Sequence, residues 1–164
     1  MMGISIRIGE AVLKERDWYE DDNDDIYFCY YDVDDMCLDE APDLLNDDFV
    51  RNSNCRLPAC TAWVEFTKET GLYEFFFNKE TGLFSPLYGC AAFDKKDVEV
   101  VQQALKARQQ YADEHGLVPG FEPGDPEERK NFKIKIDPTL LRLIWLEFWM
   151  NWAINNCKNP AITS

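Results

Sequence analysis

Residues 137–156, DPTLLRLIWLEFWMNWAINN, are the stretch that decides the fold. Asp137 followed by Pro138 predicts a helix start, because aspartate caps the first turn and proline suits the first helical position. The helix that follows is apolar nearly all round, apart from a thin polar stripe formed by Arg142, Glu147, Asn151, Asn155 and Lys158. A helix of this kind is buried, either in the core of its own chain or against a partner. We therefore expect the C-terminal helix to be largely buried.

Two other interpretations place this helix either against a second copy of the chain or in a membrane. Its tryptophans, Trp145, Trp149 and Trp152, are more than a small core usually needs, so a possible homodimer interface at these three residues is the alternative to a pure core role. A membrane span needs ~20 apolar residues with few charges. Arg142 and Glu147 interrupt this helix, so the sequence predicts no membrane partner.

Upstream of residue 137 the sequence predicts a strand, a loop and two helices. Phe132, Ile134 and Ile136 alternate with lysines, which is typical of a short strand. Residues 117–131 are rich in proline and glycine and are expected to form a loop. The two helices are bracketed by their start and stop residues, Asp94 with Gly116 and Pro58 with Gly71. The apolar run at residues 73–77 fits either a strand or a buried helix.

The N-terminal part has the patterns of a β-hairpin. Ile4, Ile6 and Ile8 alternate with small or polar residues, which predicts a strand that runs on to Val12 or Leu13. An acidic turn over residues 20–25 precedes the aromatic run 26–31, which favours a second strand. Residues 34–56 look irregular or short-helical.

These elements predict one α+β domain over residues 1–164, in which a small antiparallel sheet packs against three helices. Its parts are an N-terminal acidic hairpin region (1–56), a helical region (57–116), a loop (117–131), and a strand with the C-terminal helix (132–158). A chain of 164 residues is long enough to bury a core without disulfides or metals.

The distribution of charge is the most informative feature of the composition. Residues 10–48 hold sixteen of the 31 acidic residues and two of the 17 basic ones, so the whole net charge of −14 lies in this segment. Such a surface repels phosphate, which argues against direct binding of DNA or RNA. Ordered carboxylates can instead imitate the phosphates of a duplex and attract a basic protein surface.

The six cysteines are expected to be reduced thiols. No apolar signal segment opens the sequence, so we expect a cytoplasmic protein of a bacterial host rather than a secreted one. The cysteine spacings lack a Cys-x-x-Cys pair and the only histidine is His115, which argues against structural zinc. His115 next to Gly116 fits a role at a helix end better than acid–base catalysis.

Two acidic patterns have the residue types of a metal site. Asp32-Val33-Asp34-Asp35 after a strand resembles the nucleophile motif of the haloacid-dehalogenase phosphotransferases. That resemblance implies Mg²⁺-dependent phosphoryl transfer on a parallel sheet, with Asp32 as nucleophile and Asp34 as acid/base. Asp21, Asn23 and Asp25 have the first spacings of a calcium loop, but Ile26 stands where such a loop needs glycine. We expect a solvated acidic loop there, with no metal, no cofactor and no catalytic residue.

The function expected from these features is that of a non-enzymatic binding or inhibitor protein. Its predicted partner-binding residues are Glu20, Asp21, Asp22, Asp24, Asp25, Asp32, Asp34, Asp35, Asp39 and Glu40. The closing run 145–153, WLEFWMNWA, resembles the endings of uncharacterised bacteriophage and prophage proteins, and the whole chain resembles in style the small acidic phage proteins that block host nucleases or CRISPR effectors. The resemblance implies a basic, nucleic-acid-handling protein partner. The alternatives are a homo-oligomeric phage accessory protein and the phosphoryl-transfer enzyme.

Overall fold

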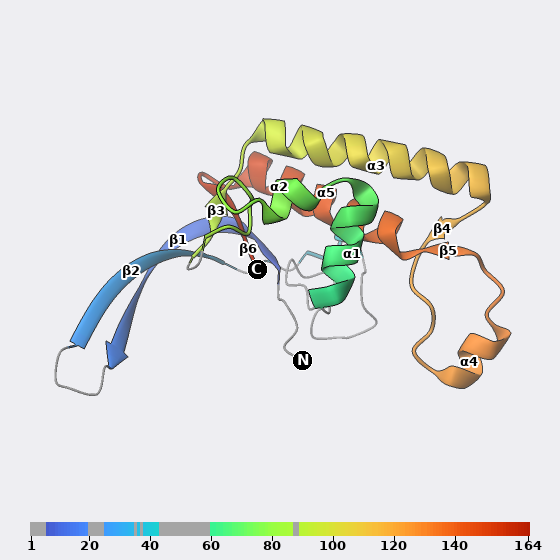
Figure 1. Ribbon diagram of the computed structural model, residues 1–164, viewed down its shortest axis with the longest axis horizontal. Helices are drawn as coiled ribbons and strands as arrows, with labels where there is room; N and C mark the ends of the chain where they lie inside the picture. The colour runs from blue at the N-terminus through green and yellow to red at the C-terminus, as the bar shows by residue number, and fades with distance from the viewer. Residues whose placement is uncertain (1–5, 20–24, 35, 37, 43–59, 87–88) are drawn as a thin grey trace.

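The computed structural model describes residues 6–19, 25–34, 36, 38–42, 60–86 and 89–164. At residues 15–19, 25–30 and 60–61 the description is of the backbone alone. The fold is α+β, as the sequence predicts, and consists of an antiparallel sheet on one side of a group of helices (Figure 1).

The four-stranded sheet is built around the two ends of the chain. Strand β1 (Arg7–Tyr19) pairs antiparallel with β2 (Asp25–Val33), which confirms the predicted hairpin. The expected tip, residues 20–24, lies outside the described residues. The other edge of β1 pairs with β6 (Pro160–Thr163), which also pairs with β3 (Ala91–Ala92), so the strand order is β2-β1-β6-β3. Every pairing in this sheet is antiparallel.

The long part of the hairpin is an arm that extends beyond the body of the protein (Figure 1). We call β1 and β2 together the hairpin arm. Only the first residues of β1 contact the rest of the sheet, since its pairing with β6 runs from Arg7 to Glu10. Beyond that point β1 has only β2 beside it in the sheet, and the directly paired Leu13 and Tyr31 are each 57% exposed.

The helices are α1 (Cys60–Thr70), α2 (Tyr73–Phe77), α3 (Lys95–His115), α4 (Pro126–Asn131) and α5 (Pro138–Asn156). The capping residues predicted for α3 are confirmed, because Asp94 forms a capping box with Asp97 and Gly116 ends the helix at φ 65°. Gly71 ends α1 at φ 75°, a left-handed conformation that glycine adopts without strain. Residues 73–77, left open by the sequence, are helical.

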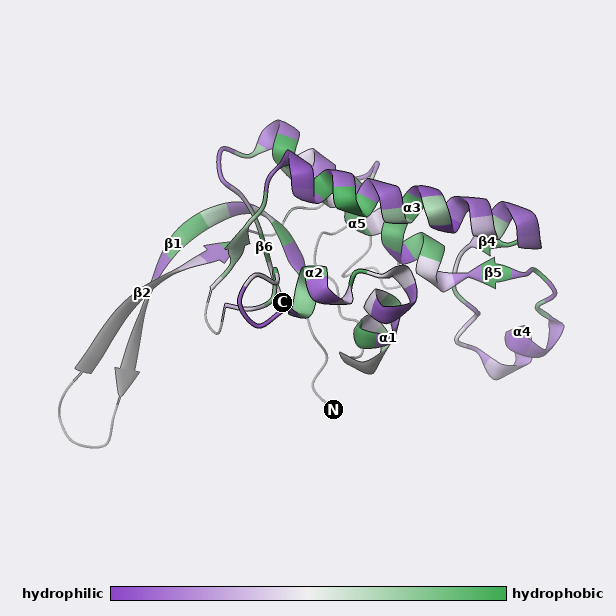
Figure 2. Cartoon of the chain, turned by 45° about the horizontal axis from the view of Figure 1, so that its top comes forward, coloured by the Kyte–Doolittle hydropathy of each residue, from purple (hydrophilic) through white to green (hydrophobic). Residues whose placement is uncertain are grey.

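Helix α5 is the centre of the core, as predicted. Its buried residues include Leu143, Leu146, Trp149 and Met150, each 0% exposed. Around them pack the buried side chains of the other elements: Trp63, Phe66, Phe76, Val98, Val101, Ile6, Ile8 and Ile162. Helix α3 runs along α5 and shows alternating hydrophilic and hydrophobic bands, as expected for an amphipathic helix that covers a core (Figures 1 and 2).

The prediction of a strand over Phe132, Ile134 and Ile136 is wrong for most of its length. Only Ile136–Asp137 forms a strand, β5, which pairs in parallel with the equally short β4 (Val118–Pro119). Ile134 is 61% exposed. The segment lies at the end of the molecule opposite the hairpin arm, away from the four-stranded sheet (Figure 1), and the strand that it pairs with, β4, is only two residues long. The predicted loop 117–131 contains α4.

No helix in the described part of the chain is long and apolar enough to cross a membrane.

Candidate functional site

The predicted partner-binding acids fall into three groups. Five of them, Glu20, Asp21, Asp22, Asp24 and Asp35, lie outside the described residues. Asp25 begins β2, where the backbone register pairs it with Tyr19 at the far end of the hairpin arm. The remaining four, Asp32, Asp34, Asp39 and Glu40, are described together with their side chains.

Asp32 is paired within the chain. Its Oδ1 accepts a bond of 2.6 Å from Arg7 Nη2 and one of 2.8 Å from the Val33 N–H, and its Oδ2 lies 3.3 Å from Lys14 Nζ. Burial by itself would raise the pKa of Asp32, but the Val33 N–H, Arg7 and Lys14 together outweigh it and hold the pKa below its usual value. Asp32 therefore joins β2 to β1, and its charge is largely matched by two cations.

Asp34, Asp39 and Glu40 are exposed, and they follow the hairpin arm in the chain. Asp34 follows β2, and its backbone N–H donates to the carbonyl oxygen of Glu10 at 3.2 Å. The Glu10 carboxylate in turn accepts from the N–H groups of Lys158 and Asn159, at 3.2 and 2.6 Å, and so holds the turn between α5 and β6. Among the acids whose side chains are described between residues 10 and 48, Asp34, Asp39 and Glu40 are thus the surface charges, whereas Asp32 and Glu10 are structural.

The three tryptophans predicted as a possible oligomer interface have different environments. Trp145 is 1% exposed and Trp149 is 0% exposed, so the chain's own core surrounds both rings. Trp152 is partly buried and meets Trp149 edge to face at 5.5 Å between ring centroids. Of the three, only Trp152 has surface to offer a second copy.

The described cysteines and the histidine do not form a reactive group. Cys90 and Cys157 are free thiols, and burial, followed by a nearby carboxylate, raises the pKa of each. His115 stacks on Tyr111 at 4.2 Å and its Nδ1 lies 2.8 Å from the Tyr111 carbonyl oxygen, at the end of α3. In the part of the chain that the structure describes, no group of three or more His, Cys, Asp or Glu residues is arranged to hold a metal ion.

A network of charged residues that the sequence did not reveal connects three helices. Arg108 of α3 donates to both oxygens of Asp137, at 2.6 and 3.0 Å, and its Nη2 also lies 2.8 Å from Glu69 Oε1 of α1. The other Glu69 oxygen accepts from the Thr139 hydroxyl at 2.9 Å. Asp137 also caps α5 by accepting from the N–H groups of Thr139 and Leu140. No sequence signal marks this network, because Glu69, Arg108 and Asp137 are far apart in the chain.

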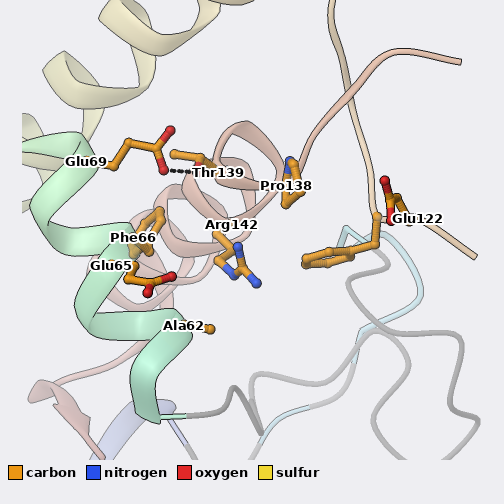
Figure 3. Close-up of a pocket in the computed structure, with 9 residues that line it drawn as sticks. Ala62, Glu65, Phe66, Glu69, Glu122, Pro138, Thr139 and Arg142 are labelled. Atoms are coloured by element: carbon orange, nitrogen blue, oxygen red, sulfur yellow. Dashed lines mark hydrogen bonds between the residues drawn. The ribbon is translucent and has the colours of Figure 1, made fainter. Parts of the chain in front are cut away.

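Beside this network lies a cavity of about 400 Å³ between α1, the start of α5 and the segment after β4 (Figure 3). Arg142 of α5 extends into it between Glu65 on α1 and Glu122 on the facing segment (Figure 3). The sequence placed Arg142 on the polar stripe of the last helix but gave it no role.

Comparison of the chain with protein-family models, with curated proteins and with solved structures gives no match.

Proposed function

We propose that this chain is a non-enzymatic binding protein that docks, through its acidic region, on a basic, nucleic-acid-handling protein. In this proposal it acts as an inhibitor of the DNA-mimic type, like phage anti-defence or anti-CRISPR proteins, in the cytoplasm of a bacterial host. One observation carries the proposal: the entire net charge of −14 falls within residues 10–48. The remainder of the chain is formally neutral.

The arrangement of the hairpin arm supports this function. Its strands project beyond the helices (Figure 1), so the acids that they carry are separated from the neutral body. Asp34, Asp39 and Glu40, which follow the arm in the chain, add three exposed carboxylates. An excess of negative charge on a surface accelerates encounter with a cationic partner and makes binding sensitive to salt.

The docking surface includes fewer acidic residues than the sequence alone would suggest. Asp32 is matched by Arg7 and Lys14, and Glu10 is engaged by two backbone N–H groups. A partner would have to break these contacts to use either carboxylate. We therefore assign a structural role to Asp32 and keep partner contact for the other predicted acids, which are Glu20, Asp21, Asp22, Asp24, Asp25, Asp34, Asp35, Asp39 and Glu40.

The two alternative functions have less support from the geometry. Assembly through the last helix would have to rely on Trp152, because Trp145 and Trp149 lie inside the core. Phosphoryl transfer at Asp32 and Asp34 would need Asp32 free to attack, and the resemblance behind it implies a parallel sheet. Asp32 is ion-paired and the four-stranded sheet is antiparallel.

A capture experiment with matched variants tests the proposal. The immobilised chain is exposed to a bacterial lysate at about 50 mM salt and eluted either with about 500 mM salt or with duplex DNA. We expect nucleic-acid-binding proteins to be captured, and we expect both the high-salt buffer and the duplex DNA to release them. The variant Asp34→Asn/Asp39→Asn/Glu40→Gln should capture less. The control Glu122→Gln/Glu127→Gln/Glu128→Gln, which removes three exposed acids at the opposite end of the molecule, should behave like the unmodified chain.

Two results would contradict the proposal. Capture that does not depend on salt would mean that charge does not drive binding. Equal loss of capture in the two triple variants would mean that only net charge matters and that the acidic region has no special role.

A further inference from the structure

The cavity between α1 and α5 has apolar walls and one basic group. Ala62, Phe66, Phe121 and Pro138 supply the apolar surface, and its volume of about 400 Å³ is that of a small-molecule pocket. The polar groups around it are Thr139, Arg142 and three glutamates. None of these residues belongs to the acidic region, so this site is independent of the proposed docking function.

The Nε of Arg142 has no hydrogen-bonding partner among the described residues. It is buried and its N–H donates to none of their acceptors, and none of their carboxylates forms an ion pair with the guanidinium. Its recorded contact is with the ring of Phe121, 4.9 Å from the guanidinium carbon to the ring centroid. Burial lowers the pKa of Arg142, with Glu69 acting in the opposite direction. Leaving such a donor unsatisfied is costly in a folded protein, which marks the site as one prepared for an acceptor.

The neighbouring network explains why Glu69, which lines the pocket, does not pair with Arg142. Glu69 lines the same cavity, but one of its oxygens is 2.8 Å from Arg108 and the other accepts from Thr139 at 2.9 Å. Arg108 also holds Asp137 through two bonds. Arg108 therefore pairs with both Asp137 and Glu69, and Arg142 faces the cavity (Figure 3).

We infer that this cavity is a binding site for a small organic monocarboxylate, whose carboxylate pairs with Arg142 and whose apolar body lies against Phe66 and Phe121. A guanidinium forms two parallel hydrogen bonds with a carboxylate, and the two terminal nitrogens of Arg142 can donate both. The aromatic and proline walls favour an apolar body over a sugar or a metal ion.

The remaining charges select against polyanions. Glu65 and Glu122 line the cavity on either side of Arg142 (Figure 3) and are both exposed. A second or third negative charge on the ligand would meet these glutamates without another free cation among the pocket residues to offset it. A ligand with an amino group next to its carboxylate would face them favourably. Inorganic phosphate and nucleotides are therefore poor ligands for this site.

Benzoate is a suitable probe, because it consists of one carboxylate on one aromatic ring. We expect saturable binding with a Kd on the order of 1 mM, measured by amide chemical-shift titration of the whole chain. The variant Arg142→Met, which keeps an apolar stem of similar length, should weaken binding at least about tenfold. The control Lys106→Met removes one exposed positive charge on α3, outside this cavity, and should leave the Kd unchanged.

A second variant keeps the test valid if Arg142→Met folds poorly. Glu65→Gln removes one negative charge beside the site and should tighten benzoate binding by about twofold to threefold. Phenylalanine as a second probe separates the two kinds of carboxylate ligand. Binding tighter than that of benzoate supports a carboxylate site that also recognises an amino group, and weaker binding supports a simple acid.

Three outcomes would overturn the inference. They are the absence of saturable benzoate binding, an unchanged Kd in Arg142→Met, and inorganic phosphate binding as tightly as benzoate. Because the capture experiment uses the acidic region and this one uses the cavity, failure of either leaves the other intact.

Discussion

Replacing Asp137 by alanine should be among the most destabilising single changes in this protein. The Asp137 side chain is 1% exposed, holds Arg108 through two hydrogen bonds and caps the first turn of α5. Its removal leaves the Arg108 charge without its main partner and two backbone N–H groups without acceptors. Arg108 is itself 18% exposed and keeps Glu69, so the loss is smaller than for a fully enclosed pair.

The expected loss in the free energy of unfolding of Asp137→Ala follows from these contacts. Breaking a buried ion pair by removing one partner costs about 3–5 kcal/mol, and losing an N-cap costs about 1 kcal/mol. With partial solvation of Arg108 we expect a loss of about 3–4 kcal/mol in the free energy of unfolding. For a domain of this size that corresponds to a fall in Tm of about 10 °C. Asp137→Asn retains a good N-cap and should lose only about 1–2 kcal/mol.

Urea denaturation, followed by tryptophan fluorescence, measures these differences. The control is Asp125→Ala, which removes the N-cap of the short and exposed helix α4 and should cost about 1 kcal/mol or less. A double-mutant cycle with Arg108→Ala isolates the coupling between Arg108 and Asp137, expected at about 1–3 kcal/mol. The reasoning is refuted if Asp137→Ala costs no more than Asp125→Ala, or if the coupling is close to zero.

Three other predictions follow from the burial and charge of single side chains. Arg142→Met should raise the stability by about 1 kcal/mol and Tm by about 2–4 °C without ligand, because a buried unsatisfied donor is removed; an unchanged or lower Tm by calorimetry would contradict this. Asp32→Asn should destabilise the protein at pH 7, and the difference should shrink as pH falls below about 4 and vanish only below the folded-state pKa of Asp32. The folded-state pKa of Asp32 is lowered, so its contribution is present above the unfolded value of about 3.9 and is lost as pH falls through the folded one; urea titrations at several pH values check the trend. Trp149→Ala should lower the free energy of unfolding by about 3–5 kcal/mol, and Trp152→Ala, at a partly buried residue, should lower it clearly less. Equal losses measured by urea denaturation would argue against the assigned core.

The elements with strong local signals were predictable. Asp94 and Gly116 bracket α3, and Asp137 with Pro138 starts α5, because capping depends on the residue and its immediate neighbours. The apolar surface of α5 required burial. The sequence also predicted the β1–β2 hairpin, although β1 continues to Tyr19, well beyond Leu13.

Elements that depend on distant partners were not predictable. Strand β6 (Pro160–Thr163) is only four residues long, and it became a central strand because β1 and β3 lie on both sides of it. The segment around Ile134 has a strand pattern, but its strand partner β4 is only two residues long and pairs with Ile136 and Asp137, so Ile134 stays exposed. A β-strand is completed by hydrogen bonds to another strand, so the local pattern alone cannot decide it.

The sequence by itself determined the α+β class, the burial of the last helix and the concentration of negative charge in residues 10–48, because these depend on composition, periodicity and capping. Only the tertiary structure decided which charges are available. In the folded chain Asp32 pairs with Arg7 and Lys14, and Arg108 pairs with both Asp137 and Glu69. Arg142 faces a cavity. The physical reason is that an ion pair is formed by groups close in space, and the fold brought together residues far apart in the chain.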